Sequence, residues 1–370
     1  MRRSRATKPR ARTRLLGGLG LALVALGAAG CASIGPATVP RDRTDYITAV
    51  AESWKEQTLL NVVRIRYGDA PSFVDVSSVI NSYSVAGQVA ATGQVPPNPA
   101  PPFPLAILGG NAAYVDRPTI TYTPVTGDKF ARSLLKPIPP SAIFELIQAG
   151  YPADAILQLT ARGINGLYGR SSQGGEVREA DPEFYAVLDA LRRLQLSGAV
   201  ALRIEKHGAD EVGILLFAHT RSAAADADYQ FVMKALRVNP GQGGEMTLTF
   251  GAQPRNDQEI AVLSRSMLAI LTEVANGIDV PSAHVAEGRA AAATRTADAA
   301  DPHDRPLVRV LSGREPPADA YAAVRYRGAW YWIADDDLPS KRVFSFLMMF
   351  FSLAETGVAA QPPVVTIPAG

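Results

Sequence analysis

The run Trp330-Tyr331-Trp332-Ile333-Ala334-Asp335-Asp336-Asp337 holds the residue types best suited to chemistry in this sequence. Indole rings beside carboxylates can bind a sugar, because the rings pack on pyranose faces and the carboxylates accept hydrogen bonds from hydroxyl groups. A pair of carboxylates can also cleave a glycosidic bond. The candidate ligand-binding residues are therefore Trp330, Trp332, Asp335, Asp336 and Asp337.

A structural role accounts for the same run. In a strand, Trp330 and Trp332 share one face and Tyr331 takes the other. The three aspartates would then stand before a helix that begins near Ser340, where acidic side chains suit the positive end of the helix dipole. Contiguous aspartates also lack the alternate spacing of a calcium loop. The sequence favours this structural role and leaves ligand binding open as the alternative.

Other catalytic or metal-binding patterns are weak. The four histidines are His207, His219, His284 and His303. They are not spaced to share a metal and have no cysteine partners, so we predict no metal and no cofactor. Ser133 and Lys136 form one S-x-x-K match, but Pro137 follows directly and disfavours helical geometry at the lysine. The sequence therefore favours a protein without catalytic activity.

Cys31 is the only cysteine of the chain, and its position indicates a location. Residues 1–14 carry seven basic side chains and no acid, and residues 15–29 are only Leu, Ala, Val and Gly. A basic start before a short apolar run that ends in small residues is typical of a secretory signal peptide. The run is shorter than the roughly 20 apolar residues of a membrane-spanning helix.

This N-terminus resembles the lipobox signal peptide of bacterial lipoproteins. In that family the cysteine sulfur receives a diacylglycerol, the signal peptide is cut directly before it, and the new amino group is acylated. The resemblance implies that residues 1–30 are removed and that Cys31 is lipidated, with chains such as palmitate. Ala28 departs from the leucine usual at that position. The alternatives are an ordinary secreted protein with a chance cysteine and an uncleaved anchor.

A single acyl chain binds a protein to a membrane only marginally, whereas several chains on one residue hold it firmly. In the lipoprotein family an aspartate after the cysteine retains the protein at the inner membrane, and this chain has Ala32 there. The resemblance thus implies a lipid anchor in the outer membrane, facing the periplasm. Cleavage removes seven of 37 basic residues and leaves 30 against 35 acidic ones, a net charge of −5. Such a chain is a poor nucleic-acid binder, so we predict no nucleic-acid partner.

Composition divides the mature chain into a tether and a globular region. Residues 31–44 contain two prolines and no apolar period, which predicts a flexible tether. Residues 45–370 are expected to form the globular region, which the lipoprotein resemblance places in the periplasm. Within it, residues 95–104 (VPPNPAPPFP) hold six prolines and predict a loop near a hairpin tip. Residues 287–306 have almost no large apolar side chain and predict a disordered loop.

Hydrophobic periodicity and turn residues predict both helices and hairpins. Helices are expected over residues 45–67, 129–135, 141–149, 181–198, 257–276 and 340–355. Residues 73–89 are expected to form a strand or a hairpin. Further strands are expected over residues 117–125, 200–205, 212–217, 245–250, 307–311, 321–334 (turning at Arg327-Gly328) and 364–367. Residues 154–167 and 228–238 stay open between helix and strand. This irregular alternation predicts an α+β fold with mostly antiparallel sheet and packed helices.

Three segments resemble an uncharacterised family of bacterial envelope lipoproteins: LLNVVRIRYGDAPSFVDVSS, RPTITYTPVTGDKFARSLLKPIPPS and YRGAWYWIADDDLPSKRVF. The resemblance brings no known activity. The sequence therefore predicts a lipid-anchored, non-catalytic binding or scaffolding component of the periplasm or outer membrane, with an envelope protein or a glycan as partner. The alternatives are a periplasmic carboxylate-dependent hydrolase acting on glycan or peptidoglycan, and an accessory lipoprotein of a secretion or export complex.

Overall fold

The structure is a computed structural model that describes residues 34–80, 83–94, 105–172, 177–207, 210–241 and 243–355. Cys31, the signal peptide expected at residues 1–30, the proline-rich segment 95–104 and the strand expected at 364–367 lie outside these residues. The chain divides into two compact units. Met1–Ala51 and Val79–Thr119 form the first, here called the hairpin unit, and Glu52–Ser78 and Ile120–Gly370 form the second, here called the body.

The fold is α+β with mostly antiparallel strands, as the sequence predicts. The largest sheet of the body has the order β6-β5-β10-β9-β8-β7. Its strands are β5 (Ala161–Ile164), β6 (Leu167–Tyr168), β7 (Val200–His207), β8 (Asp210–Phe217), β9 (Glu245–Phe250) and β10 (Glu259–Ser264). Within this sheet β9 and β10 are parallel, and the other neighbours pair antiparallel.

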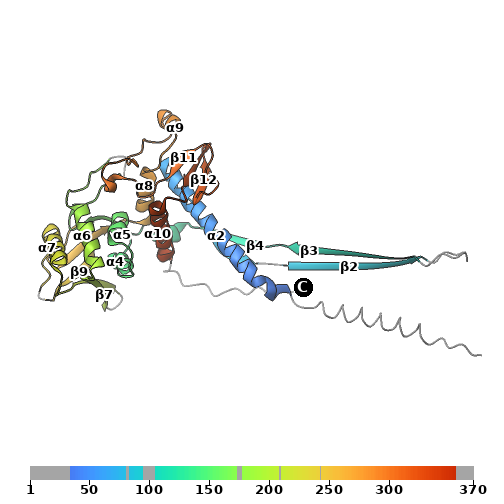
Figure 1. Ribbon diagram of the computed structural model, residues 1–370, viewed down its shortest axis with the longest axis horizontal. Coiled ribbons are helices and arrows are strands. Elements are labelled where there is room, and N and C mark those ends of the chain that lie inside the picture. Colours follow the sequence, from blue (N-terminus) through green and yellow to red (C-terminus); the bar gives the residue numbers. More distant parts are fainter. Residues whose placement is uncertain are drawn as a thin grey trace, which may run out of the picture. The chain divides into compact units, whose positions relative to one another are not determined.

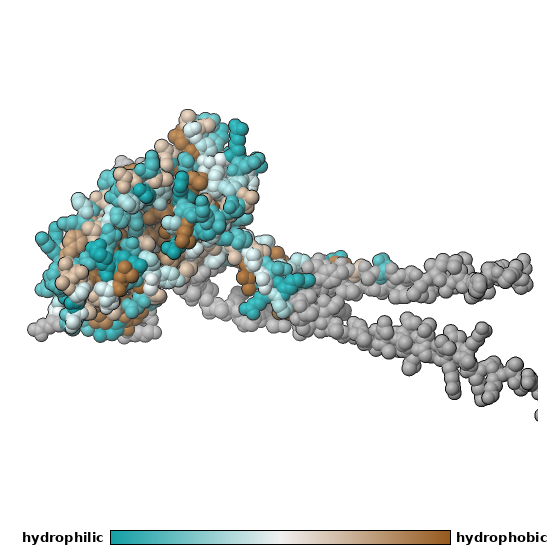
Figure 2. Space-filling view, viewed as in Figure 1, coloured by the Kyte–Doolittle hydropathy of each residue, from teal (hydrophilic) through white to brown (hydrophobic). Residues whose placement is uncertain are grey.

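Helices α4 (Pro140–Gln148), α5 (Ala153–Thr160), α6 (Phe184–Leu196) and α7 (Ala223–Leu236) gather on this sheet (Figure 1). Helix α4 contacts β7, β8 and β9, while α5 and α7 pack against α6. The α6 side chains that are buried recur at steps of three and four residues, as expected of an amphipathic helix; they are Phe184, Val187, Leu188, Ala190, Leu191 and Leu194. The visible face of the body is mostly hydrophilic, with scattered apolar residues (Figure 2).

A three-stranded sheet has the order β11-β13-β12. Its strands are β11 (Leu311–Gly313), β12 (Ala322–Tyr326) and β13 (Ala329–Ile333). Arg327 and Gly328 connect β12 to β13, as predicted, and have φ angles of 47° and 87°, which suit a two-residue hairpin turn. The last helix, α10 (Leu338–Glu355), follows and buries Phe344, Leu347, Phe350 and Phe351.

Helix α2 (Ile34–Arg66) corrects the predicted tether. It begins at Ile34, so residues 34–44 are helical and not extended. Pro36 lies in the first turn, where a missing N–H leaves no hydrogen bond unmade. Pro40 lies inside the helix, and the helix continues through it. The tether prediction was wrong for these residues, because Pro36 lies where a helix tolerates proline and the helix continues past Pro40.

Two further expectations about the body were wrong. Residues 257–276 form strand β10 and then helix α8 (Met267–Asn276), and not one helix. Strand β10 is inside the largest sheet, where Ile260, Ala261 and Val262 are all buried. A continuous apolar run of this kind cannot be told from a helix segment by its periodicity.

Residues 287–306 are ordered, although their composition predicts disorder. The Arg295 side chain is 3% exposed and pairs with the 1% exposed Glu273 of α8 at 2.9 Å. The Thr294 N–H also donates to the carbonyl of Asn276 at 3.2 Å. Only short helices occur here or directly before it: α9 (Ser282–Ala286) and η3 (Pro302–Asp304). A buried ion pair thus takes the place of apolar burial.

The remaining boundaries refine the predictions. Residues 127–135 hold α3 (Gly127–Phe130) and a π-helical turn, η1 (Ala131–Leu135). The ambiguous residues 154–167 supply most of α5 with β5, and residues 228–238 are mainly helical, within α7. Strand β1 (Val74–Ile80) pairs with β4 (Thr119–Pro124). Among the helices that the structure describes, none is both long enough and apolar enough to cross a membrane.

The hairpin unit contains the sheet of β2 (Tyr83–Gln94) and β3 (Leu105–Asp116), drawn as two long arrows in Figure 1. Pairing runs from Tyr83↔Asp116 to Gln94↔Leu105. The sequence did not predict β3 as a strand. Its glycines and alanines give little strand propensity.

Candidate functional site

The two tryptophans of the candidate site lie in different surroundings. Trp330 and Trp332 are both half-buried and share one face of β13, while Tyr331 is fully buried on the other. This alternation is the predicted one. Trp332 lies against Gly313, where an added Cβ would be 3.0 Å from the indole ring. Trp330 instead lines a groove.

The three aspartates stand at the start of α10. The Asp337 carboxylate accepts hydrogen bonds from the Ser340 N–H at 3.1 Å and the Ser340 hydroxyl at 2.7 Å. Asp335 pairs with Lys341 at 2.6 Å, and Asp336 is exposed. Two of the three carboxylates therefore serve the first turn of the helix. A ligand-binding role for the five residues stays a prediction.

The groove beside Trp330 has a volume of about 800 Å³, and all its lining residues belong to the body. Residues 321–325 along β12 form one wall. The opposite wall is the second half of α2, where the spacing of the lining residues places them on one helix face; they are Glu52, Ser53, Glu56, Gln57 and Leu60. The lining also includes Ser72, Pro316, Pro317, Ala318, Ala320 and Trp330.

Strand β12 is at the edge of its sheet, and among the described residues no strand pairs with its outer side. Next to a two-residue turn, Tyr326 and Ala329 form a hydrogen-bonded pair, and pairs then alternate along the hairpin. Ala323 and Arg325 therefore belong to non-hydrogen-bonded pairs, opposite Trp332 and Trp330. Their N–H and C=O groups point away from β13, on the side of the groove that both residues line.

The charged side chains of the groove are partly paired. Lys55 pairs with Glu52 at 2.7 Å, donates to the Tyr321 carbonyl at 3.4 Å and lies 4.5 Å from the centre of the Tyr321 ring. Glu56 and Arg325 are exposed, and within the described residues neither makes an ion pair. The groove thus offers one carboxylate, one guanidinium and unpaired backbone groups to a ligand.

Two amide side chains fix the helical wall to the segment that enters β1. Gln57 donates to the Val74 carbonyl at 3.1 Å and accepts from the Val74 N–H at 2.8 Å. Asn61 does the same with Ser72, at 2.8 Å in both bonds. Each amide imitates the backbone of a neighbouring strand. This double ladder holds the wall in place before any ligand binds.

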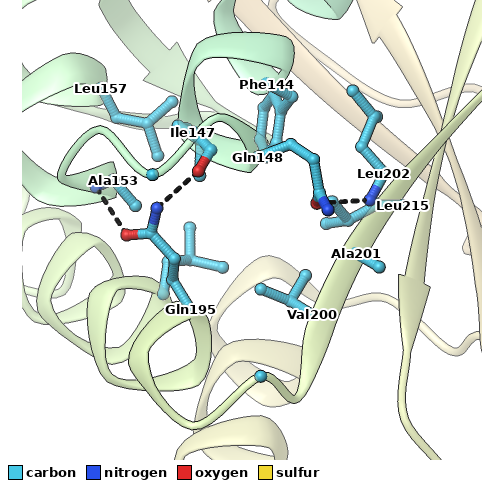
Figure 3. A pocket seen from close by; sticks show the side chains of 13 residues that line it. Phe144, Ile147, Gln148, Ala153, Leu157, Gln195, Val200, Ala201, Leu202 and Leu215 are labelled. Atoms are coloured by element: carbon cyan, nitrogen blue, oxygen red, sulfur yellow. Dashed lines mark hydrogen bonds between the residues drawn. The ribbon is translucent and has the colours of Figure 1, made fainter.

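A second cavity, of about 340 Å³, lies among α4, α5, α6 and β7 (Figure 3). Its lining is mostly apolar, and its two glutamines bind within the chain. Gln195 accepts from the Ala153 N–H at 3.1 Å and donates to the carbonyls of Ile147 at 2.6 Å and Tyr151 at 2.7 Å. Gln148 accepts from the Leu202 N–H at 3.0 Å. A ligand site normally keeps a few polar groups free to orient its ligand, so this cavity is a weaker candidate than the groove.

The S-x-x-K match does not form a catalytic pair. Ser133 is buried in the π-helical turn, and Lys136 leaves it with a ψ of 130°. This is the departure that Pro137 predicts. Both residues line a cavity of about 600 Å³ with Arg132 and Glu145, but in the described part of the chain no hydrogen bond joins Ser133 to Lys136.

The sequence did not predict a chain of hydrogen bonds that joins Tyr67, Tyr331 and His284. The Tyr67 hydroxyl is 2.5 Å from the Tyr331 hydroxyl and 2.5 Å from Nδ1 of His284. Burial, and then the hydrogen bond with Tyr67, raise the pKa of Tyr331. Tyr67 directly follows α2, Tyr331 belongs to β13 and His284 to α9, and Tyr67 is 264 positions from Tyr331 and 217 from His284. No spacing in the sequence could have brought them together.

Comparison with known proteins adds nothing to this geometry. No family model, no curated protein and no solved structure matches the chain. Across the residues that the structure describes, no group of three or more His, Cys, Asp or Glu side chains could hold a metal ion. The groove along β12 is therefore the candidate site that the geometry supports best.

Proposed function

We propose that this chain is a lipid-anchored cell-envelope protein that binds an extended segment of another envelope protein along β12. Cys31 would hold it at the periplasmic face of the outer membrane. One observation carries the binding role: the unpaired edge of β12 borders a groove of about 800 Å³. An extended peptide can add a strand to such an edge, where main-chain hydrogen bonds give affinity and the walls select side chains.

The groove favours a peptide over a glycan. Only one of the two indole rings, that of Trp330, lines it, and Trp332 lies against Gly313. The carboxylates of Asp335 and Asp337 bind Lys341 and Ser340. Two rings and a set of free acids, as a sugar platform needs, are therefore not gathered in the groove. Alternating N–H and C=O groups along a strand instead match the repeat of another peptide backbone.

The side chains around the edge indicate which peptide fits. Glu56 can pair with a basic side chain and Arg325 with an acidic one, because neither makes an ion pair in the described structure. Trp330 offers an apolar surface between the walls. We therefore expect an extended segment of mixed charge with an apolar residue among the charged ones.

A peptide library tests the binding role. Random peptides displayed on phage are selected on the purified full chain in detergent, and the tightest one is measured by fluorescence anisotropy. Ala323→Pro removes one outward N–H and leaves the pairing with β13 intact, because proline is tolerated at a strand edge. We expect it to weaken binding about tenfold, the equivalent of about 1.4 kcal/mol.

Two tryptophan variants provide the matched comparison. Trp330→Ala should weaken peptide binding, and Trp332→Ala should leave it unchanged, with circular dichroism confirming that both variants fold. An equal loss in both, or full competition by soluble peptidoglycan fragments, would indicate a glycan platform and reject the peptide groove. Failure to select any peptide would reject it as well.

The anchor has its own test. Mass spectrometry of the N-terminal peptide from native membranes should show a diacylglyceryl group on Cys31 and an acylated amino group. An intact Met1, or a free thiol on Cys31, would contradict the anchor and would leave the groove unaffected.

A further inference from the structure

The β2–β3 hairpin is a long two-stranded sheet. Its two strands have twelve residues each, about twice the usual length of a strand. Their pairing is continuous, from Tyr83↔Asp116 to Gln94↔Leu105. In the described part of the chain no third strand joins this sheet. Because an isolated two-stranded hairpin is at best marginally stable in water, its strands need partners.

The outer edges of the hairpin are available for pairing. In an antiparallel strand every second residue directs its N–H and C=O away from its partner. Natural proteins usually block such edges with charges, prolines or bulges. Here Asp116, at the last position of β3, is the only charged residue in the two strands. Neither strand contains proline.

The two edges of the largest sheet in the body differ from those of the hairpin. At the β7 edge of its largest sheet, the Gln148 side chain binds the Leu202 N–H at 3.0 Å. At the opposite edge, β6 has only two residues. The same chain therefore covers an outward N–H at one edge of that sheet and shortens the other edge, whereas β2 and β3 have twelve residues each with no charge before Asp116 and no proline.

We propose that β2 of one copy of this chain pairs with β3 of a second copy. The two free edges have the same length, and antiparallel order continues when β3 of one hairpin lies beside β2 of the next. Neither edge carries a charge before Asp116, so two copies meet without like-charge repulsion. A foreign strand would cover one edge and leave the other open, whereas further copies cover both. Such a head-to-tail contact builds a closed ring or an open array.

Helix α2 supports this assembly with a second surface in the same unit. Val39, Ile47 and Val50 are 58%, 58% and 38% exposed. Their spacing of eight and three residues places them on one side of the helix. Large apolar side chains that line up on an exposed helix face are typical of a surface that meets another protein.

Cysteine cross-linking tests the pairing directly. One tagged full-length chain carries Gln88→Cys, and a second chain with another tag carries a single cysteine on β3. The hairpin register sets Gln88 opposite Asn111, so the scanned positions are Ile107, Gly109, Asn111 and Ala113. With one new cysteine per chain, a disulfide that joins both tags must lie between two copies. It requires Cα atoms about 4.4–6.8 Å apart, so we expect it at one or two neighbouring positions.

The controls make the result decisive. Parental chains that keep Cys31 alone give the baseline, and Leu196→Cys with Ala224→Cys, both exposed on the body, gives the level of random collision. A product above both levels supports the pairing. No β3 position above these levels, in oxidised native membranes, overturns it.

The mass of the particle gives a second readout. In one variant, Asn-Gly replaces residues 85–114 and joins Ser84 to Val115 in a two-residue turn. Mass photometry in detergent should show a multiple of the 39.3 kDa precursor mass, less the signal peptide, for the wild type and a single chain for the variant. A single-chain wild type, or a variant that still assembles, rejects the proposal. Peptide binding at β12 is measured separately, so the two proposals can fail independently.

Discussion

The sheet edges of the body and those of the hairpin unit are treated in opposite ways. In the body, Gln148 covers the Leu202 N–H at one edge of the largest sheet, and the other edge strand has two residues. In the hairpin, β2 and β3 extend over twelve residues each with no charge before Asp116. One amide side chain thus covers an outward N–H of the β7 edge. The open edges of the chain therefore mark the places where we expect a partner strand.

Strand β12 lies between these extremes. Tyr321 directly precedes this strand, and its carbonyl group accepts a hydrogen bond from Lys55 at 3.4 Å. The next outward groups, on Ala323 and Arg325, remain open toward the groove. An edge of this length suits a short peptide, whereas the longer hairpin edges suit strands of their own kind.

The two regions should also differ in how they are stabilised. The body has a large buried apolar core, to which buried polar contacts such as that of Glu273 with Arg295 are added. The hairpin is held by the continuous pairing of β2 with β3.

The largest effect is expected from Arg295→Ala. The variant leaves the Glu273 carboxylate buried without its partner, so the free energy of unfolding should fall by about 3–5 kcal/mol. Urea titration measures the loss. The matched control is Arg289→Ala, which breaks the exposed 2.7 Å pair with Glu287 and should cost less than about 1 kcal/mol. Equal losses would mean that the buried pair does not hold residues 287–306.

The next effect depends on pH. Burial, and then the hydrogen bond with Tyr67, raise the pKa of Tyr331 above its ordinary value of 10.0. Below pH 10 both the folded and unfolded states keep the phenol proton. Above it the unfolded state loses this proton first, so the stability of the fold falls by up to about 1.4 kcal/mol per pH unit.

Tyr331→Phe should remove that alkaline loss, which thermal melts between pH 8 and 11 can measure. The control is Tyr122→Phe, at a side chain that is 61% exposed, and it should keep the wild-type slope. A Tyr331→Phe slope equal to the control would show that Tyr331 is not held in its neutral form.

Removing the Gln148 side chain, which binds the Leu202 N–H at the sheet edge, should have a smaller effect on stability. Gln148→Ala leaves the Leu202 N–H without its acceptor and should cost about 1 kcal/mol. Gln148→Glu keeps an acceptor oxygen and should cost less. In the shortened-hairpin background, sedimentation should also show that Gln148→Ala associates at high concentration while Gln148→Glu does not. A monomeric Gln148→Ala would separate edge closure from association.

The smallest effect is expected from shortening the hairpin. The core residues of the body lie outside Val79–Thr119. Shortening the hairpin should therefore change the free energy of unfolding of the body by less than about 0.5 kcal/mol, with a correspondingly small shift in its melting temperature. Differential scanning calorimetry of the variant in which Asn-Gly replaces residues 85–114 measures this melting temperature. A large drop would show that the hairpin supports the body and is not a separate assembly element.

Local patterns were sufficient for part of this structure. The hairpin turn at Arg327-Gly328, the alternation of Trp330 and Tyr331, and the last helix follow from turn chemistry and periodicity. The helix-start role of Asp337 follows from the helix dipole, and Ser340 completes it.

The remainder depends on contacts between distant positions. Strand β10 is apolar because both its faces are covered, which periodicity cannot distinguish from a helix. Residues 287–306 are ordered by Glu273, which is 22 positions before Arg295. The open edge of β12 exists because β13 takes its other side, and only the topology shows which strand is last in a sheet. For these reasons Trp330 was a candidate from the sequence, whereas Glu56, Ala323 and Arg325 were not.

Hydrogen exchange of the backbone amides of β2 and β3 tests the central claim most directly, that another copy closes the open edges. In the assembled full chain, all amides of both strands should exchange slowly, including those on the outer edges. After dilution to single chains the outer amides should exchange within seconds. Rapid exchange of the outer amides in the assembled protein, or slow exchange that dilution leaves unchanged, would contradict the account.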